Sequence, residues 1–161
     1  MLNPKQFVGL VIEPALRALD MYSVDAMYLM AATAFIESKL THIKQIPNGP
    51  ALGIYQIEWT TYIDCLRYLT LRDELRDKVL LYLDRQNFPT QQSALVSDLA
   101  LSTCIARIKY WMQPEPLPSY KDRHAQWEYY KQYYNTKAGA ATVEQFNKAY
   151  DDIEVWINER V

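Results

Sequence analysis

The chain has 161 residues, of which 50% are hydrophobic, and a net charge of −2 with a sequence pI near 5.7. This length fits a single domain with one core of ordinary size, and we expect residues 1–161 to form it. The slight negative charge argues against nucleic acid as a partner, because a nucleic-acid-binding protein would carry a basic face. No apolar stretch reaches about 18 residues, and the N-terminal segment lacks a charged region followed by an apolar core. We therefore expect neither stable membrane insertion nor a secretory signal.

The hydrophobic pattern predicts helices almost throughout the chain. In chain order, the expected ranges are 4–19, 24–38, 59–69, 71–84, 91–112, 122–134 and a last helix that follows Thr142. Residues 114–118 are rich in proline and should be extended. Only residues 51–57 could form a short extended piece.

Side chains suited to capping stand at the start of several of these helices. Asn3 and Pro4 are typical of a helix N-cap and of the first helical position. Ser23 and Thr90 can cap the helices that follow them. Thr142 and Gln145 have the spacing of a capping box. In the helix predicted over 71–84, the apolar face is formed by Leu71, Leu75, Val79 and Leu83.

The helix predicted over residues 24–38 is apolar nearly all round. From Val24 to Ile36, only Asp25 and Thr33 are clearly polar, so this helix should lie at the centre of the domain. It ends on Glu37, where burial and the negative end of the helix dipole both disfavour ionisation. A glutamic acid that keeps its proton near neutral pH can serve as a general acid.

Three separated motifs occur in a recognisable order. Glu37-Ser38 is followed by a loop, then by the segment GIYQIEWTT from Gly53, and much later by Tyr134-Asn135-Thr136. This arrangement resembles the lysozyme-like lytic transglycosylases, and small phage-encoded members in particular. The family positions are occupied by Gly53, Ile54, Tyr55, Gln56, Ile57 and Thr61. Trp59 stands where the family usually has proline, and Thr136 where many members have alanine.

The resemblance implies a lysozyme-like, all-α or nearly all-α fold whose buried central helix carries the catalytic Glu37 at its end. It also implies cleavage of peptidoglycan glycan strands without a metal or another cofactor. The implied substrate-binding residues are Ser38, Gly53, Ile54, Tyr55, Gln56, Tyr134 and Asn135. Gln56 would offer its amide to the sugar, Gly53 would let the backbone approach it closely, and the Tyr134 hydroxyl would orient Glu37.

The same resemblance bears on the biological setting. It implies a phage endolysin, or a virion-associated protein with other virion proteins as partners. Such a protein is made in the cytoplasm of the host cell or packaged in a virion, and it acts on the cell wall.

The distribution of carboxylates indicates the type of reaction. Residues 38–57 contain no Asp or Glu, so no base is evident for activating water. This favours a lytic transglycosylase, in which Glu37 alone acts as acid and base and the product is a 1,6-anhydro sugar. One alternative is a hydrolytic lysozyme that uses Glu58 or Asp64, although Glu58 is better explained as an acid at the start of the following helix. The other is a catalytically silent structural or binding module.

The other reactive side chains favour structural roles. Cys65 and Cys104 lie in apolar helical patterns and are expected to be buried, inert thiols, while a disulfide between them stays open. His42 and His124 stand apart from any cluster with metal-ligand spacing. Arg107 should form an ion pair inside the domain.

Overall fold

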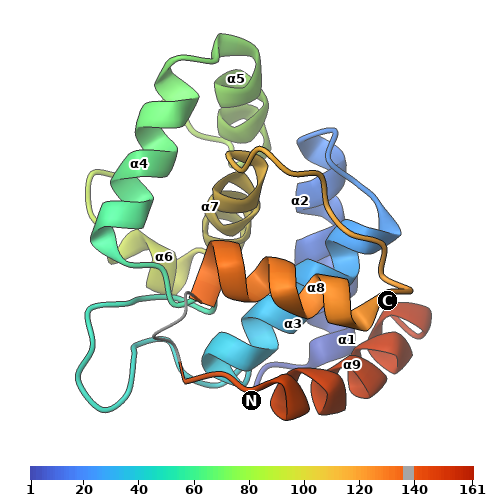
Figure 1. The fold of residues 1–161 in the computed structure, drawn as a ribbon. Coiled ribbons are helices and arrows are strands. Elements are labelled where there is room, and N and C mark those ends of the chain that lie inside the picture. The colour runs from blue at the N-terminus through green and yellow to red at the C-terminus, as the bar shows by residue number, and fades with distance from the viewer. Residues whose placement is uncertain (136–139) are drawn as a thin grey trace.

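The computed structural model describes residues 1–135 and 140–161, and the described chain is almost entirely helical (Figure 1). This agrees with the predicted all-α class. The short extended piece expected over 51–57 is reduced to two isolated antiparallel bridges, which join Leu52 to Lys44 and to Ile57. Among the described residues, no helix combines the length and the apolarity needed to cross a bilayer.

Most elements follow one another with short connections, and the longer loops cover residues 39–58, 83–93 and 112–122. In chain order the elements are α1 (Pro4–Phe7), η1 (Val8–Ile12), α2 (Glu13–Ala18), α3 (Val24–Ser38), α4 (Trp59–Thr70), α5 (Asp73–Tyr82), α6 (Ala94–Ser97), α7 (Leu99–Trp111), α8 (Arg123–Tyr130), η2 (Lys131–Asn135) and α9 (Val143–Asn158). The elements η1 and η2 are π-helical turns.

The predicted first helix is one continuous rod made of α1, η1 and α2. The side chain of Asn3 caps it by accepting a hydrogen bond from the Gln6 amide at 3.1 Å, and Pro4 occupies its first turn. The π-helical turn stands directly before Pro14, which has no N–H to donate to the carbonyl of Leu10 and would clash with it in a regular α-helix. The wider turn relieves that conflict, and the Glu13 amide bonds instead to the Val8 carbonyl.

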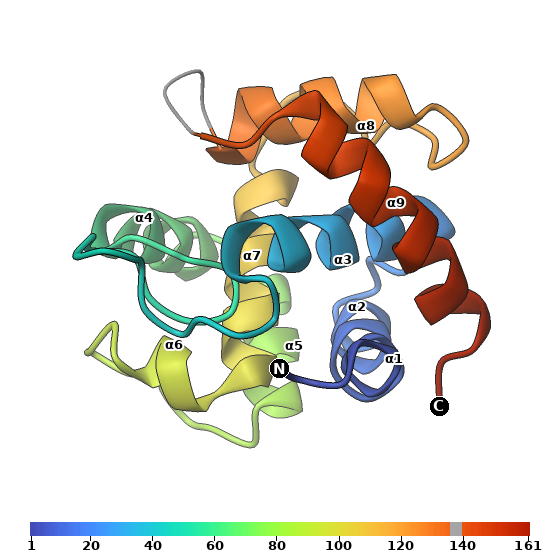
Figure 2. The same cartoon turned by 90° about the horizontal axis from the view of Figure 1, so that it is seen from below.

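Helix α3 lies at the centre of the domain, as predicted from its apolarity. Ser23 caps it, since its hydroxyl accepts the Ala26 amide at 3.0 Å. Met27, Met30 and Ala34 are completely buried. Helices α2, α7, α8 and α9 contact α3, and Figure 2 shows it in the middle of them. The C-terminal end of α3 is therefore held firmly by the core.

Helix α9 closes the core over α3. The capping box predicted for Thr142 and Gln145 is present, with both reciprocal hydrogen bonds formed. One stripe of the helix is buried, and it consists of Phe146, Ala149, Tyr150, Ile153 and Ile157. Tyr150 packs beside Tyr28 of α3 with ring centroids 5.0 Å apart, so aromatic contacts join the two helices.

Two expectations for the middle of the chain were wrong. The helix predicted over 91–112 is divided into α6 and α7 at Asp98, and Thr90 caps neither. Asp98 adopts an extended conformation (φ −116°, ψ 95°), and its carboxylate accepts the Leu101 amide at 2.8 Å. A short acidic side chain that bonds to a nearby amide starts a new helix rather than continuing the old one. Leu71, expected on the buried face of α5, lies before that helix and is 82% exposed.

Both cysteines are free and buried, as favoured from the sequence. The Cys65 thiol donates to the Ile105 carbonyl at 3.7 Å. Burial raises the pKa of Cys65 to about 12 and raises that of Cys104 as well. Thiols that resist ionisation in this way are poor nucleophiles, so neither is suited to covalent chemistry.

Candidate active site

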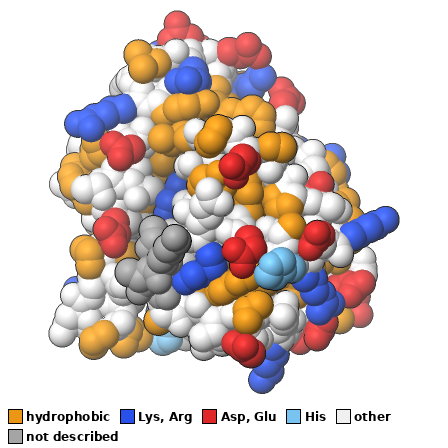
Figure 3. Space-filling view, viewed as in Figure 1, with side chains coloured by type: hydrophobic (Ala, Val, Ile, Leu, Met, Phe, Trp, Pro, Cys, Tyr) orange, Lys and Arg blue, Asp and Glu red, His pale blue; other side chains and the backbone are white. Residues whose placement is uncertain are grey.

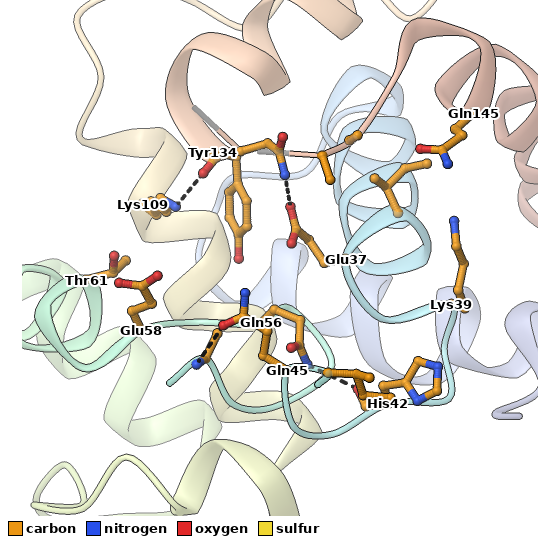
Figure 4. Close-up of a pocket in the computed structure, with 16 residues that line it drawn as sticks. Glu37, Lys39, His42, Gln45, Gln56, Glu58, Thr61, Lys109, Tyr134 and Gln145 are labelled. Carbon is orange, nitrogen blue, oxygen red and sulfur yellow. Dashed lines mark hydrogen bonds between the residues drawn. The ribbon is translucent and has the colours of Figure 1, made fainter. Parts of the chain in front are cut away.

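A cleft of about 740 Å³ opens at the C-terminal end of α3. Its walls come from α3, the loop between α3 and α4, the start of α4, helix α7, the π-helical η2 and the approach to α9 (Figure 4). The polar side chains that face it most directly are Glu37, Gln56, Glu58, Lys109, Tyr134 and Asn135. The cleft therefore gathers residues that are far apart in the sequence around the end of the central helix.

The backbone after Glu37 explains why its carboxyl group reaches the cleft. Lys39 adopts the left-handed conformation (φ 55°), and its amide bonds back to the Phe35 carbonyl, which ends α3. Leu40 is left-handed too, with φ 51°. The chain thus turns sharply away from the helix axis, and the last turn of α3 is left open on the side where Glu37 projects.

Two side chains hold the Glu37 carboxyl group through the same oxygen. The Tyr130 hydroxyl donates to Glu37 Oε1 at 2.7 Å, and Asn135 Nδ2 donates to Oε1 at 3.1 Å. No described residue donates to Oε2. Because Oε1 already accepts two hydrogen bonds, a proton on the acid belongs on Oε2. The arrangement fixes the orientation of the group and leaves its acidic hydrogen free to meet a ligand.

The surroundings raise the pKa of Glu37 above that of an ordinary glutamate. Burial is the largest cause, and it outweighs the hydrogen bonds from Tyr130 and Asn135 and the positive charges of Lys109 and Lys131, all of which lower the pKa. The negative end of the α3 dipole acts in the same direction as burial. The side chain is therefore protonated over a wider range of pH than a solvated glutamate, as its position in the sequence predicts.

Lys109 is a partly buried cation on the opposite wall of the cleft. Its ammonium donates to the Tyr134 carbonyl at 3.0 Å and lies 3.8 Å from the centroid of the Tyr134 ring. Burial lowers the pKa of Lys109, while the nearby Glu37 carboxylate raises it. The two groups thus interact electrostatically across the cleft, and the positive charge of Lys109 favours the ionised form of Glu37.

The π-helical turn η2 determines which side chains meet Glu37. In an α-helix each residue turns about 100°, so Asn135 would lie about 140° around the axis from Tyr130, and Tyr134 only about 40°. A π turn bonds each residue to the fifth one along, which brings positions five apart onto one face. Tyr130 and Asn135 therefore converge on Glu37.

The role predicted for the Tyr134 hydroxyl was wrong. The hydroxyl does not reach Glu37; it donates to the Tyr55 carbonyl at 2.8 Å. Tyr134 still lines the cleft, and its bond ties η2 to the loop that carries Gln56. Tyr130 takes the orienting position instead.

The segment from Gly53 to Gln56 shapes the floor of the cleft. Gln56 has a positive φ of 47°, and its Nε2 donates to the Gly53 carbonyl at 2.8 Å and to the His42 carbonyl at 3.2 Å. Both amide hydrogens are thus used within the protein, and Oε1 is the atom that Gln56 can offer to a ligand.

Gly53 does not serve the close approach to a sugar that was expected of it. It is buried with φ 77°, and a methyl group there would lie 2.4 Å from the Leu95 carbonyl oxygen. The close approach is therefore between this loop and α6, inside the protein.

Three other predicted substrate-binding residues lie beneath the cleft rather than in it. Ser38 is fully buried, and its hydroxyl donates to the Ala34 carbonyl at 2.8 Å and accepts the Leu40 amide at 3.2 Å. Ile54 and Tyr55 are buried in the core. These residues support the end of α3 and the floor of the cleft, and a ligand in the cleft would not touch their side chains. Of the predicted set, the cleft is lined by Glu37, Gln56, Tyr134 and Asn135.

The two carboxylates considered as a second catalytic group differ in position. Asp64 does not line the cleft; it is exposed and pairs with Arg67 at 3.4 Å. Glu58 lines the cleft from the start of α4. It occupies the N-cap position of α4, as favoured from the sequence, and its side chain makes no capping hydrogen bond.

Tyr130 and Lys109 are the important members of the site that sequence reasoning missed. Tyr130 stands in the segment WEYYKQYY, where the pattern alone does not distinguish one tyrosine from another. Lys109 had a usable signal, because it is a lone lysine in the largely apolar stretch from Leu99 to Trp111. A cation that must be buried with a helix face needs an explanation, and a nearby acid is the usual one.

The described residues contain no group of three or more His, Cys, Asp and Glu side chains placed to hold a metal ion. Comparison of the chain with protein-family models, with curated proteins and with solved structures finds no match to any of them. What the cleft can do is therefore inferred from its own geometry, which is that of one oriented, partly desolvated carboxylic acid at the edge of an open groove.

Proposed function

We propose that this protein is a peptidoglycan lytic transglycosylase with a lysozyme-like fold, which cleaves the β-1,4 bond between N-acetylmuramic acid and N-acetylglucosamine. The observation that carries the proposal is the state of Glu37. Its pKa is raised, one oxygen is clamped by Tyr130 and Asn135, and the other oxygen is left for a ligand in the cleft. A phage endolysin or a virion-associated protein that opens the cell wall fits this activity.

The proposed reaction uses Glu37 twice. The proton on Oε2 passes to the glycosidic oxygen as its bond to the anomeric carbon breaks, and the leaving sugar departs as an alcohol. Positive charge develops on the muramic acid ring, where the acetamido group can stabilise it. The Glu37 carboxylate then removes the proton of the 6-hydroxyl, whose oxygen bonds to the anomeric carbon. The product is a 1,6-anhydro sugar, and Glu37 recovers its proton.

The clamp on Oε1 suits both halves of this cycle. Glu37 becomes negative when it gives up its proton, and the hydrogen bonds from Tyr130 and Asn135 strengthen as charge develops on the carboxylate. The positive charge of Lys109 acts in the same sense. Burial favours the protonated form of the resting acid, whereas the two hydrogen bonds and Lys109 favour the carboxylate that forms when the proton leaves.

A hydrolytic lysozyme is the second candidate, because Glu58 lines the same cleft. In that reaction Glu58 would activate a water molecule, and the product would have a reducing end. The transglycosylase is favoured because the 6-hydroxyl belongs to the substrate itself and therefore has a high effective concentration.

Mass spectrometry of muropeptides released from purified cell wall in heavy-oxygen water tests the proposal. Anhydro products without the label are expected from the wild-type protein. Glu37→Gln should reduce release by at least about a hundredfold, the usual size of a general-acid contribution. Glu58→Gln should reduce it only modestly. Labelled reducing ends that disappear in Glu58→Gln would identify a lysozyme, and full release by Glu37→Gln would exclude Glu37 from the mechanism.

A further inference from the structure

A second cavity, of about 560 Å³, lies away from the Glu37 cleft. It is formed by the C-terminal end of α7, the loop over residues 112–117 and the turn over residues 20–23 that precedes α3. The two cavities share no lining residue. A stack of tyrosine rings separates them, since Tyr110 packs against Tyr129 with centroids 5.7 Å apart and against Tyr134 at 5.2 Å.

Arg107 lines this second cavity and is the reason to regard it as a binding site. The residue is only 4% exposed. The ion pair expected for it from the sequence is absent, because no described residue forms a salt bridge or a hydrogen bond with its guanidinium, and its Nε atom is buried without a partner. Arg107 Cζ lies over the ring of Trp111, 5.3 Å from its centroid.

A buried guanidinium without an acceptor is unusual, because buried charges are normally paired. Burial lowers the pKa of Arg107 to about 10, so the group still carries its charge at neutral pH. The acidic residues at the same cavity are engaged elsewhere. Asp20 pairs with Lys78 at 2.9 Å, and the carboxylate of Glu115 accepts a hydrogen bond from the Tyr133 hydroxyl.

Part of the wall around Arg107 is apolar. Leu117, Pro114 and Pro116 face the cavity together with Tyr22. In Figure 3, hydrophobic side chains gather over this end of α7 and the loop that follows it. The loop is held by the Tyr129 hydroxyl, which donates to the Glu115 carbonyl at 3.0 Å. The cavity therefore combines the size of a small-ligand site with aromatic, proline and leucine side chains and one cationic group, Arg107, while Asp20, Ser23, Gln113 and Glu115 add polar groups to its lining.

We propose that this cavity binds a carboxylate carried on an apolar body, with the guanidinium of Arg107 as its anchor. A planar carboxylate matches the fork of N–H donors on arginine. A phosphate monoester is a poorer fit, because Arg107 is the only basic side chain among the described residues that line the cavity, while Asp20 and Glu115 are acidic. One positive charge balances one carboxylate, and the aromatic and proline side chains cover the rest of the ligand.

Binding of phenylacetate to the wild-type protein, followed by NMR or calorimetry, tests the proposal directly. Phenylacetamide has the same shape without the charge, and phenyl phosphate has an apolar ring with a larger charge. We expect saturable binding of phenylacetate at millimolar concentrations and at least about tenfold weaker binding of both analogues. Binding of phenylacetamide equal to that of phenylacetate would overturn the proposal, as would tighter binding of phenyl phosphate or no binding of phenylacetate.

Variants show whether Arg107 is the anchor. Arg107→Met keeps an unbranched apolar stem and removes the guanidinium and its charge, and it should lower the affinity for phenylacetate by at least about tenfold. Unchanged affinity in a folded Arg107→Met protein would refute the assignment. Trp111→Ala removes one wall and should weaken binding, whereas Trp59→Ala, which changes a tryptophan of similar exposure outside the cavity, should not. The comparison of ligands on the wild-type protein stands even if Arg107→Met does not fold.

The ligand could be a free organic acid or the carboxyl end of a peptide, and the same assay distinguishes the two. N-acetyl-leucyl-phenylalanine supplies a peptide carboxylate, and its C-terminal amide is the matched control. Tighter binding of the peptide acid than of phenylacetate, lost in the amide, identifies a peptide terminus. The reverse order identifies a small free acid, and equal binding of the peptide acid and its amide would count against a carboxylate anchor.

Discussion

The hydroxyl of Tyr130 and the amide of Asn135 both end on one oxygen of Glu37, which makes the two oxygens of this carboxyl group chemically distinct. One serves to hold the group and the other to exchange its proton. A solvated glutamate has no such distinction, because its two oxygens interchange freely. The consequences of this asymmetry can be measured one side chain at a time.

Tyr130→Phe should slow the proposed reaction and shift its pH dependence. The hydroxyl favours the ionised form of Glu37, so its loss raises the pKa of that residue further. The rate should fall by about tenfold, which is the value of one hydrogen bond to a charged group. The alkaline limb of the kcat/KM profile should move to higher pH, because the acid then keeps its proton longer.

Tyr134→Phe is the matched control, since its hydroxyl bonds to the Tyr55 carbonyl and not to Glu37. It should leave the alkaline limb in place. If Tyr134→Phe moved the limb and Tyr130→Phe did not, the orienting role assigned to Tyr130 would be wrong.

Lys109→Met should move the same limb in the same direction. The positive charge of Lys109 lowers the pKa of Glu37, and methionine removes that charge while keeping an unbranched side chain. The limb of the pH profile is the quantity to measure. Lys39→Met is the control, because Lys39 is an exposed lysine on the same cleft whose charge is screened by solvent. Equal shifts in the two variants would show a general effect of surface charge.

At the scale of single residues, the sequence indicated Glu37 and Asn135 as site residues and missed Tyr130 and Lys109. The position of Glu37 at the end of an apolar helix is a local property, and the raised pKa follows from it. The choice between Tyr130 and Tyr134 depends on which hydroxyl meets Glu37 and which meets the Tyr55 carbonyl in the folded chain, and the side-chain pattern does not encode this. Ser38 and Gly53 were predicted to bind substrate because they lie in the same motifs as Glu37 and Gln56. Both instead stabilise the backbone beneath the cleft, and the motif alone does not distinguish these two roles.

At the scale of elements, the loop from Gly53 to Gln56 is packed tightly against α6. The Gly53→Ala variant tests how much this packing contributes to the stability of the domain. The methyl group would approach the Leu95 carbonyl within 2.4 Å, at a φ of 77° that alanine adopts only with strain. We expect a loss of at least about 2 kcal/mol in the free energy of unfolding, measured by chemical denaturation.

Gly49→Ala is the control for that measurement, because its methyl group would meet only the flexible end of the Gln45 side chain, and Gly49 has no positive φ. It should cost little. A similar cost for both variants would mean that the close contact with Leu95 does not set the stability of the loop.

The helices were largely predictable because the residues that cap their N-terminal ends can be recognised from the local sequence. Ser23, Asn3 and the Thr142–Gln145 pair each cap the helix that follows, as expected from residue type and spacing. The break at Asp98 was not predictable from periodicity, because α6 and α7 together keep an apolar pattern. Asp98 could continue the helix or cap a new one by accepting the Leu101 amide, and in the structure it is a cap. Its ion pair with Arg85 at 2.9 Å supports the capping conformation.

At the scale of the whole molecule, the stability of the domain should depend on pH through the ionisation of Glu37. A carboxyl group with a raised pKa in the folded state contributes most to stability at pH values below its unfolded pKa. That contribution is lost as the pH rises through the folded pKa. Glu37→Gln cannot ionise and keeps an oxygen to accept from Tyr130 and Asn135.

The variant should therefore have a higher Tm than the wild-type protein at neutral pH, and the difference should vanish in acid, where both side chains are neutral. Thermal unfolding followed by circular dichroism over a range of pH measures this. A Tm difference that stays constant from acid to neutral pH would mean that Glu37 ionises as readily in the folded state as in the unfolded one.

The wide turn of η2 also suggests how such a site can be encoded in other chains. The two partners of Glu37 are a tyrosine and an asparagine five positions later in the sequence. This spacing brings both side chains to the acid only where the helix widens into a π turn. One residue inserted into an ordinary helix is enough to create that widening. A chain could thus acquire this clamp, or lose it, by a change in length that alters none of the side chains involved. Alignments that score residue types column by column would overlook such an event.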